Sequence, residues 1–352
     1  MEQRSGIFIV SLDFELYWGV RDTRTLDSYR RQLDGELWCI PRILELLCAN
    51  QVHATWATVG FLLYPGYRAL LDELPERIPA YRNARLSPYG YLNRRAIPRD
   101  LERYHFAPYL VRSIASFPGQ EIATQTFSHF LCLEEGPNEE DFRADLAAAV
   151  RVAGNFGIGF KSIVFPRNQI LSQYLPACAD FGLEAYRGTE RHWMYLPRKS
   201  REESLRNRSM RYLDSYFNVS GNNCYSIQQV AGSIPLNLPS SRFLRPYSRK
   251  LAFLEPLKLR RVLRAMEHAA RNGLIYHIWW HPHNFGLHPQ EGLATLNTIV
   301  QQFVRLRDDF GMASLNMRDL ASLILRAEAR RGGSSLEKGP ALGRRHTGTR
   351  QS

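Results

Sequence analysis

The chain has 352 residues, of which 44% are hydrophobic, and its formal net charge is +12. This size and apolar content suit a globular protein with a large core and exclude a fibrous or wholly disordered chain. No window approaches the ~20 uninterrupted apolar residues of a membrane span, and the N-terminus lacks the apolar core of a signal peptide. We therefore expect a cytoplasmic protein without a membrane span. Five scattered cysteines favour reduced structural thiols over a disulfide framework.

The basic residues are spread along the chain, with local clusters at residues 201–211, 242–261 and 330–345. No recognisable nucleic-acid-binding motif accompanies these clusters, so the sequence does not indicate a nucleic-acid partner. A steady positive excess also attracts an anionic substrate. A nucleotide-linked or undecaprenyl-linked sugar is an example of such a substrate.

Hydrophobic periodicity predicts that strands and helices alternate along most of the chain. The predicted strands are residues 7–10, 53–60, 120–127, 162–165, 184–187, 274–280 and 312–315. The predicted helices are residues 27–50, in which Pro41 can introduce a kink, 106–117, 138–152, 171–181, 257–272, 291–307 and 317–331. This alternation indicates an α/β protein with a parallel sheet, which is either doubly wound or closed into a barrel.

Two long segments lack this periodicity. Residues 64–105 contain five prolines among arginines and tyrosines, and residues 189–245 are dense in Arg, Ser, Asn and Tyr. We interpret the first segment as a connection that lines a binding site and the second as an insertion over the site. Residues 1–331 are thus predicted to form a single domain, followed by a disordered tail at 332–352.

Two carboxylates, Asp13 and Glu15, follow the first predicted strand. If the extended backbone persists, both side chains point to the same side, about 7 Å apart along the strand. Two acids at the carboxyl end of a strand suit a metal ligand beside a general base, because such ends face the active site in α/β folds. The simpler interpretation is a strand-end cap or a surface ion pair.

Polar side chains also follow the predicted strands 120–127 and 162–165. His129 comes four residues after Gln125, and the two meet on one face only if the backbone curls after the strand. An amide oxygen is a poorer zinc ligand than imidazole, and a lone histidine is commonly a structural residue. Arg167, in the sequence FPRNQ, would hold a neighbouring buried carboxylate ionised, unless this segment is an ordinary turn.

The sequence YHIWWHPHNFG, residues 276–286, contains His277, His281 and His283 together with two tryptophans. Imidazole is suited to proton transfer near neutral pH, and indole rings provide flat apolar surfaces on which sugars stack. An aromatic core with histidines at its edge is the alternative. We interpret the segment as part of a functional site.

Four motifs, SLDFELYWG, EIATQTFSHF, SIVFPRNQ and HIWWHPHNFG, together resemble the signature of polysaccharide deacetylases, carbohydrate esterase family 4. They are most similar to a divergent branch that occurs with bacterial surface-polysaccharide biosynthesis, including that of lipopolysaccharide. The resemblance covers about residues 6–325 and implies a distorted (β/α) barrel of about seven strands. Family members remove an N- or O-acetyl group from a sugar by means of one divalent cation, commonly zinc.

The resemblance also implies roles for individual residues. Glu15 stands where the metal-binding acid is expected, and His129 matches the second histidine of the family's HxxxH metal motif. Gln125 occupies the place of the first histidine, which is a departure from the family. The implied metal ligands are therefore Glu15, His129 and Gln125, with zinc as the expected ion.

Asp13 matches the family's catalytic base, and His281 resembles its general acid. Arg167 resembles the arginine that orients the catalytic aspartate, although the order FPRNQ differs from the usual motif. Further residues of the motifs are expected to contact the sugar: Trp18, Asn168, Trp280, His283 and Asn284.

Two functions stay open on the sequence. The first is a metal-dependent deacetylase that acts in the cytoplasm on a carbohydrate precursor of a cell-surface glycan. The second is a catalytically impaired relative that binds a sugar or a partner enzyme. Retention of Asp13, Glu15, Arg167 and His281 together favours the first function, whereas Gln125 favours the second.

Overall fold

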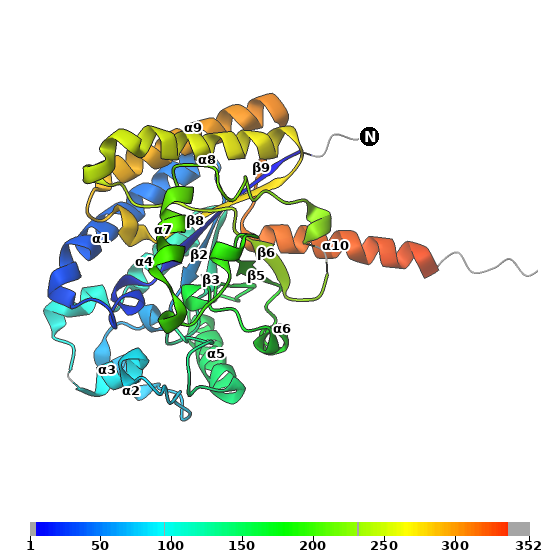
Figure 1. Cartoon of the computed structure of the whole chain (residues 1–352). Helices are drawn as coiled ribbons and strands as arrows, with labels where there is room; N and C mark the ends of the chain where they lie inside the picture. Colours follow the sequence, from blue (N-terminus) through cyan, green and yellow to red (C-terminus); the bar gives the residue numbers. More distant parts are fainter. Residues whose placement is uncertain (1–4, 95, 231, 337–352) are drawn as a thin grey trace, which may run out of the picture.

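A parallel sheet surrounded by helices forms the centre of the computed structural model, which describes residues 5–94, 96–230 and 232–336 (Figure 1). Its strands are β1 (Ile7–Phe14), β2 (Ala54–Thr58), β3 (Gln120–Thr124), β4 (Ser162–Ile163), β5 (Ala185–Gly188), β6 (Leu236–Pro239), β7 (Arg242–Phe243), β8 (Ile275–Trp280) and β9 (Ala313–Ser314). The strand order is β6-β5-β4-β3-β2-β1-β8-β7, and β9 pairs with β1. The predicted parallel α/β architecture is confirmed.

One extended segment, residues 236–244, contains both β6 and β7 and joins the two ends of this sheet. β6 pairs with β5, and β7 pairs with β8. Between them, Ser240 N donates to Gly188 O at 2.9 Å and Ser241 N donates to His277 O at 2.7 Å. The segment therefore closes the sheet into a distorted barrel. Counted as one strand, it brings the sheet to eight strands including β9, one more than the predicted seven.

Helices cover the outside of the barrel (Figure 1). They are α1 (Leu26–Ala49), α2 (Tyr67–Asp72), α3 (Pro88–Arg94), α4 (Pro108–Ser116), α5 (Glu139–Gly154), α6 (Leu175–Asp180), α7 (Leu205–Asp214), α8 (Glu255–Arg271), α9 (Pro289–Phe310) and α10 (Met317–Leu336). Each of the seven predicted helices corresponds to one of them. Helix α1 continues through Pro41.

Alternation along β1 explains how the sheet separates two apolar regions. All eight residues of β1 are buried. Phe8 and Leu12 belong to the large core between the sheet and the helices, whereas Ile7 and Ile9 belong to a smaller core inside the barrel. Successive side chains of a strand point to opposite faces, so one strand serves both cores.

Helix α10 covers the amino ends of the strands. Its apolar residues belong to the small interior core with Ile9 and Ile275, namely Met317, Leu320, Ala321 and Ile324. The three larger side chains, Met317, Leu320 and Ile324, each contribute about 1.5–3 kcal/mol of hydrophobic stabilisation. The barrel interior is thus filled at this end, which leaves the carboxyl ends of the strands for a functional site.

Two predicted boundaries are wrong. Helix α10 runs to Leu336, so residues 332–336 are helical rather than part of a disordered tail; a helix that has already formed gains one backbone hydrogen bond for each residue added. The rest of the predicted tail lies outside the described residues. Residues 189–245 are not wholly an insertion, since they include β6 and β7. Pro235 and Pro239 make this part of the sequence resemble a loop.

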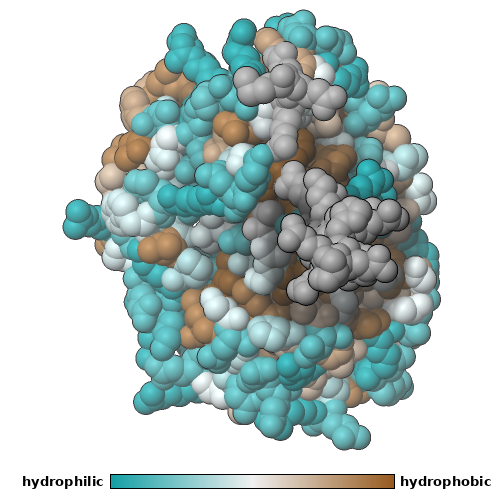
Figure 2. All heavy atoms as spheres, turned by 90° about the vertical axis from the view of Figure 1, so that its right-hand side faces the viewer, coloured by the Kyte–Doolittle hydropathy of each residue, from teal (hydrophilic) through white to brown (hydrophobic). Residues whose placement is uncertain are grey.

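No helix in the described ranges has the length and apolar character needed to cross a membrane. The face from which α10 projects is mostly hydrophilic, with separate hydrophobic patches (Figure 2).

Candidate active site

Polar side chains gather at the carboxyl ends of β1, β3 and β8, which lie in one half of the barrel. Asp13 and Glu15 come from the end of β1, Gln125 and His129 follow β3, and His281 follows β8. All of these side chains are buried except that of His281, which is 22% exposed. These five side chains thus lie at one mouth of the barrel, whereas Arg167, which was predicted to join them at Asp13, pairs with Asp22 instead.

A bidentate ion pair fixes Asp13. Nη1 of Arg187 donates to Oδ1 of Asp13 at 2.5 Å, and Nη2 donates to Oδ2 at 2.8 Å. Both side chains are almost completely buried. A guanidinium in this geometry matches both carboxylate oxygens, and it offsets the cost of burying the negative charge.

Oε1 of Glu15 is the point on which the other polar side chains converge. Nε2 of Gln125 donates to this oxygen at 2.6 Å, Nε2 of His129 lies 3.3 Å away, and Nε2 of His281 lies 3.7 Å away. Burial alone would raise the pKa of Glu15, but the imidazoles of His281 and His129 together bring that pKa well below its usual range. Glu15 is therefore a carboxylate at neutral pH.

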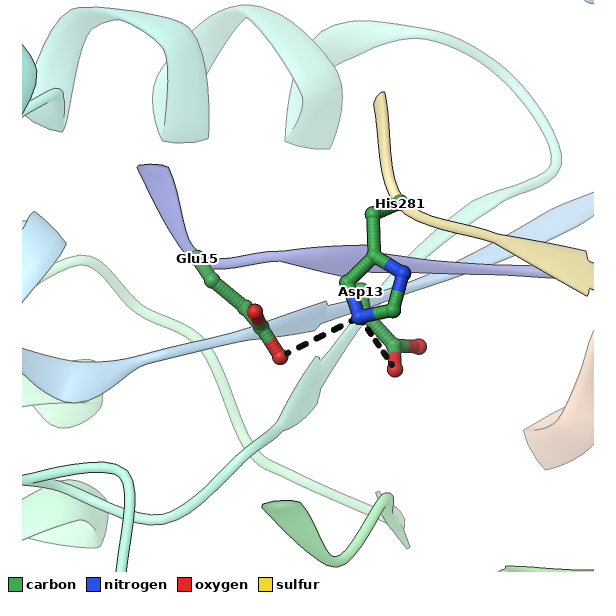
Figure 3. Close-up of side chains that lie close together, drawn as sticks. All are labelled: Asp13, Glu15 and His281. Carbon is green, nitrogen blue, oxygen red and sulfur yellow. Dashed lines mark ion pairs between the residues drawn. The ribbon is translucent and has the colours of Figure 1, made fainter. Parts of the chain in front are cut away.

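The imidazole of His281 lies between the two carboxylates (Figure 3). Its Nε2 is 3.6 Å from Oδ2 of Asp13 and 3.7 Å from Oε1 of Glu15. A water molecule or a substrate group that lies between His281 and Asp13 could therefore exchange a proton with either side chain.

The donor atoms at this site fit a divalent cation. In the described ranges, one group of three possible ligand side chains lies within 4.8 Å of one another: Asp13, Glu15 and His281. The ligands predicted from sequence, Glu15, Gln125 and His129, also meet at Oε1 of Glu15. The second set leaves Asp13, whose oxygens each accept one hydrogen bond from Arg187, available for another role.

Gln125 contributes two opposite features to this fit. Its Nε2 donates a hydrogen bond to the Glu15 oxygen that would bind a cation. Its Oε1 is buried and has no hydrogen-bond partner among the described residues. Rotation of the amide would turn this oxygen toward the site, so Gln125 is a usable ligand, although a weaker one than imidazole.

The backbone adopts unusual conformations at this mouth of the barrel. Thr126, His129, Arg167 and Asn168 have φ values of 65°, 62°, 55° and 52°, in the left-handed region that residues with a Cβ rarely occupy. Such strain persists where the surrounding structure enforces it, and it often occurs at functional sites.

Ser11 and His277 support Asp13 from inside the barrel. Oγ of Ser11 accepts a hydrogen bond from Nη1 of Arg187 at 3.2 Å and lies 2.8 Å from Nε2 of His277. Burial, together with the charge of Arg187, lowers the pKa of His277 to about 3. His277 is therefore neutral and has a structural role.

His283 and Asn284 lie behind His281. The ring of His283 stacks on that of His281 at 4.8 Å between centroids, and burial, with the charge of His281, lowers its pKa to about 3. Oδ1 of Asn284 accepts a hydrogen bond from His281 N at 3.2 Å. Both residues thus orient His281, and contact with a sugar stays a prediction for them.

Arg167 does not hold the position predicted for it. Its Nη2 lies 2.6 Å from each carboxylate oxygen of Asp22, and Arg187 is the arginine that orients Asp13. Arg187 ends the predicted strand 184–187, where period-two alternation places it on the same face as Ala185 inside the barrel. This alternation could have identified Arg187 from the sequence. The FPRNQ motif instead indicated Arg167, which is not the arginine that contacts Asp13.

Two of the predicted sugar contacts are wrong. Trp18 is 1% exposed, and its Nε1 donates to His105 O at 2.7 Å. Trp280 is 0% exposed and stacks on Phe285 in the core outside the barrel. Neighbouring residues of a strand point to opposite faces, so Trp279, which precedes Trp280 on β8, lies on the side of the active site.

Trp279 is an aromatic residue that borders the site. Its ring lies 4.1 Å from the guanidinium carbon of Arg187 and 5.7 Å from the ring of His281. Asn168, also predicted to contact the sugar, accepts a hydrogen bond from Nη2 of Arg187 at 3.1 Å. Both residues border the Asp13 carboxylate.

Solved structures with a similar fold place the barrel in a known class. A protein assigned as a polysaccharide deacetylase from Mycobacterium smegmatis is 16% identical, with a TM-score of 0.56 over 99% of this chain and 97% of that chain. A protein of the same assignment from Pseudomonas aeruginosa PAO1 is 11% identical, with a TM-score of 0.52 over 92% of each chain.

The fold is therefore that of polysaccharide deacetylases. A 4-alpha-glucanotransferase from Thermococcus litoralis is also similar, with 12% identity and a TM-score of 0.51 over 91% of this chain but only 40% of its own. No protein-family model matches the sequence, and no curated protein does either.

Proposed function

We propose that this protein is a hydrolase that removes an acetyl group from an N-acetylated or O-acetylated sugar. We further propose that it acts in the cytoplasm, in the biosynthesis of a bacterial surface polysaccharide. The observation that carries the proposal is the buried Asp13 carboxylate, held by Arg187 and 3.6 Å from His281 at the open end of the barrel. The polysaccharide deacetylase fold supports the same reaction class.

Asp13 is the general base in this mechanism. Each of its oxygens accepts one hydrogen bond from Arg187, and a carboxylate oxygen keeps a second lone pair for a water molecule. As that water attacks the acetyl carbon, its proton passes to Asp13. Arg187 holds the carboxylate in place during the transfer, so little reorganisation is needed.

His281 is the general acid. The tetrahedral intermediate collapses when its C–N or C–O bond breaks, and the leaving amine or alcohol then needs a proton. Nε2 of His281 lies 3.6 Å from Oδ2 of Asp13 and 3.7 Å from Oε1 of Glu15, so it is close to the position at which the leaving group departs. His283 and Asn284 keep the ring in this position.

Glu15, His129 and the amide oxygen of Gln125 would hold a divalent cation, for which zinc is the proposed ion. When bound, such a cation supplies Lewis-acid polarisation of the acetyl carbonyl.

Acetate release tests the proposal. The purified protein is expected to release acetate from an N-acetylated or O-acetylated sugar, and His281→Gln is expected to lower the rate about 10²-fold. His288→Gln serves as the matched control, since His288 contacts Tyr247 and none of the site residues above. The absence of acetate release from every sugar tested would contradict the proposal.

Zinc affinity tests the role of Gln125. Gln125→His is expected to bind zinc more than about tenfold more tightly than the wild-type protein, because it adds an imidazole ligand to the site. Competition with a chromophoric chelator measures this affinity, and Gln51→His, at an exposed position, is the control. Equally tight zinc binding by the wild-type and Gln125→His proteins would show that Gln125 does not weaken zinc binding.

The hydrogen bond from Gln125 to Glu15 also favours a second candidate function. This hydrogen bond occupies the Glu15 oxygen in the absence of a cation. Such an arrangement is expected in a catalytically impaired relative that binds a sugar or a partner enzyme. Sugar binding without acetate release by the zinc-loaded protein would support this alternative.

A further inference from the structure

A cavity of about 340 Å³ lies beside the active site and is rich in arginine. Its polar wall contains five arginines, namely Arg167, Arg198, Arg211, Arg242 and Arg245. Two acids, Glu190 and Glu203, also line it, so the formal charge of the lining is positive. Neither the proposed acetyl hydrolysis nor the cation site uses these arginines.

The cavity shares part of its wall with the active site. Trp279 and Asn168 line the cavity, and both contact Arg187, which holds Asp13. Phe243 lines the cavity as well, and its ring lies 6.1 Å from the ring of His281. A group bound in this cavity is therefore adjacent to a sugar whose acetyl group lies at Asp13.

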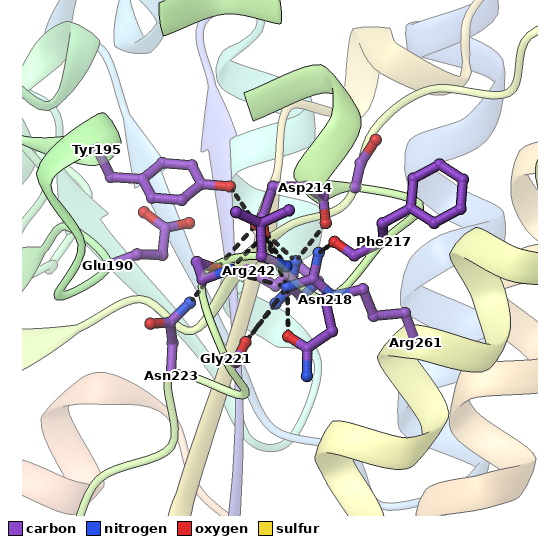
Figure 4. Close-up of polar contacts among 12 residues, drawn as sticks. Glu190, Tyr195, Asp214, Phe217, Asn218, Gly221, Asn223, Arg242 and Arg261 are labelled. Atoms are coloured by element: carbon purple, nitrogen blue, oxygen red, sulfur yellow. Dashed lines mark hydrogen bonds and ion pairs between the residues drawn. The ribbon is translucent and has the colours of Figure 1, made fainter. Parts of the chain in front are cut away.

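Some of these arginines are occupied by structural contacts. Nη1 of Arg242 lies 3.4 Å from Oδ2 of Asp214, in a buried network that ties the segment after α7 to β7 and α8 (Figure 4). Arg261 joins the same network at 3.0 Å from Asp214. Nη2 of Arg211 pairs with Glu203 at 2.8 Å. Together with the pair of Arg167 and Asp22, these contacts account for three of the five cavity arginines and for one of the two acids.

Arg198 and Arg245 have no acidic partner among the described residues. Arg198 donates to the carbonyls of Trp193 and Met194. The half-buried guanidinium of Arg245 lies over the rings of Tyr212 and Phe243, at 5.2 and 5.7 Å from their centroids. A partly buried cation without a counter-charge is costly, so an anionic ligand at this position would stabilise both arginines.

The remaining acid does not prevent anion binding. Glu190 is buried and receives a hydrogen bond from Nε1 of Trp279 at 3.4 Å. Burial raises the pKa of Glu190, which favours its neutral form. A neutral carboxyl group can donate a hydrogen bond to an anion.

We propose that this cavity binds a phosphate group of the substrate, so that the acetylated sugar enters the site as a phosphate or diphosphate ester. The proposal rests on the deacetylase function proposed above and assigns its substrate class. Planar guanidinium groups match phosphate oxygens in geometry and charge, and Phe243 and Trp279 form the part of the wall between these arginines and the active site.

Calorimetric titration of the intact protein tests the proposal. The probes are N-acetylglucosamine, its 1-phosphate and its uridine diphosphate ester. The phosphorylated probes are expected to bind at least about tenfold more tightly than the neutral sugar, and Arg245→Gln and Arg198→Gln are each expected to remove most of that difference. Arg206→Gln, an exposed position on α7 outside the cavity, is expected to leave it unchanged.

Equal affinity for neutral and phosphorylated sugars, or full phosphate preference in both cavity variants, would overturn the proposal. Two variants are used so that a folding defect in one leaves the test valid. A short polyprenyl diphosphate sugar provides a fourth probe: tighter binding of this ester identifies a lipid-linked substrate, and tighter binding of the uridine ester identifies a nucleotide-linked one.

Calorimetry reports binding and the acetate assay reports turnover, so the two proposals fail in different ways. Phosphate preference without acetate release overturns the deacetylase function but keeps the phosphate site. Acetate release from neutral sugars alone, without phosphate preference in binding, overturns the phosphate site but keeps the deacetylase function.

Discussion

Substitution of Asp13 by asparagine is expected to lower the rate of acetate release by about 10²–10⁴-fold, the usual contribution of a general base. The amide has nearly the same shape as the carboxylate and can still accept a hydrogen bond from Arg187. It cannot accept a proton from water at neutral pH, so the chemical step is lost while the geometry of the site is largely kept. Acetate release under saturating sugar measures this effect.

Sugar binding separates loss of chemistry from loss of structure in this variant. Asp13→Asn is expected to bind the substrate with an affinity within about threefold of the wild type, since Asp13 acts on water rather than on the sugar. Asp308→Asn, on the exposed face of α9, is the matched control and should keep full activity. A variant that binds sugar and releases acetate at the wild-type rate would exclude Asp13 as the base.

The sequence was informative about the site where strand ends carry unusual polar residues. Asp13, Glu15, His129 and His281 each follow an apolar strand, and parallel strands bring their carboxyl ends to one edge of a sheet. Convergence of these residues therefore followed from the predicted topology without knowledge of any contact. The contact between Gln125 and Glu15 could be anticipated only through the resemblance to a metal motif.

Contacts between strands distant in the sequence could not be predicted. Asp13 is 174 positions from Arg187, and although alternation places each side chain on the inner face of its strand, nothing local in either strand specifies that the two pair. Arg167 was chosen because it stands in a distinctive motif, but its backbone turns at φ 55° and its side chain reaches Asp22. The closing segment 236–244 was missed for a similar reason, since its prolines conceal a strand that pairs on both sides.

Replacement of Arg187 by methionine is expected to lower the free energy of unfolding by about 3–5 kcal/mol, as is typical when one partner of a buried ion pair is removed. Methionine keeps much of the apolar volume of the side chain, but it leaves the Asp13 carboxylate buried without its cation. Denaturant unfolding measures the change. Arg30→Met, which removes an exposed pair with Asp27, should change the same quantity by less than about 1 kcal/mol.

The double variant Asp13→Asn/Arg187→Met tests whether the stabilisation by Arg187 depends on its ion pair with Asp13. Once Asp13 is neutral, loss of the guanidinium no longer leaves a buried charge unpaired, so the two substitutions together should destabilise the protein less than the sum of the single changes. A coupling of about 1–3 kcal/mol is expected for residues in direct contact. Strict additivity would mean that Arg187 stabilises the barrel through its contacts with Trp279, Ser11 and Asn168, and that the orientation of Asp13 does not depend on it.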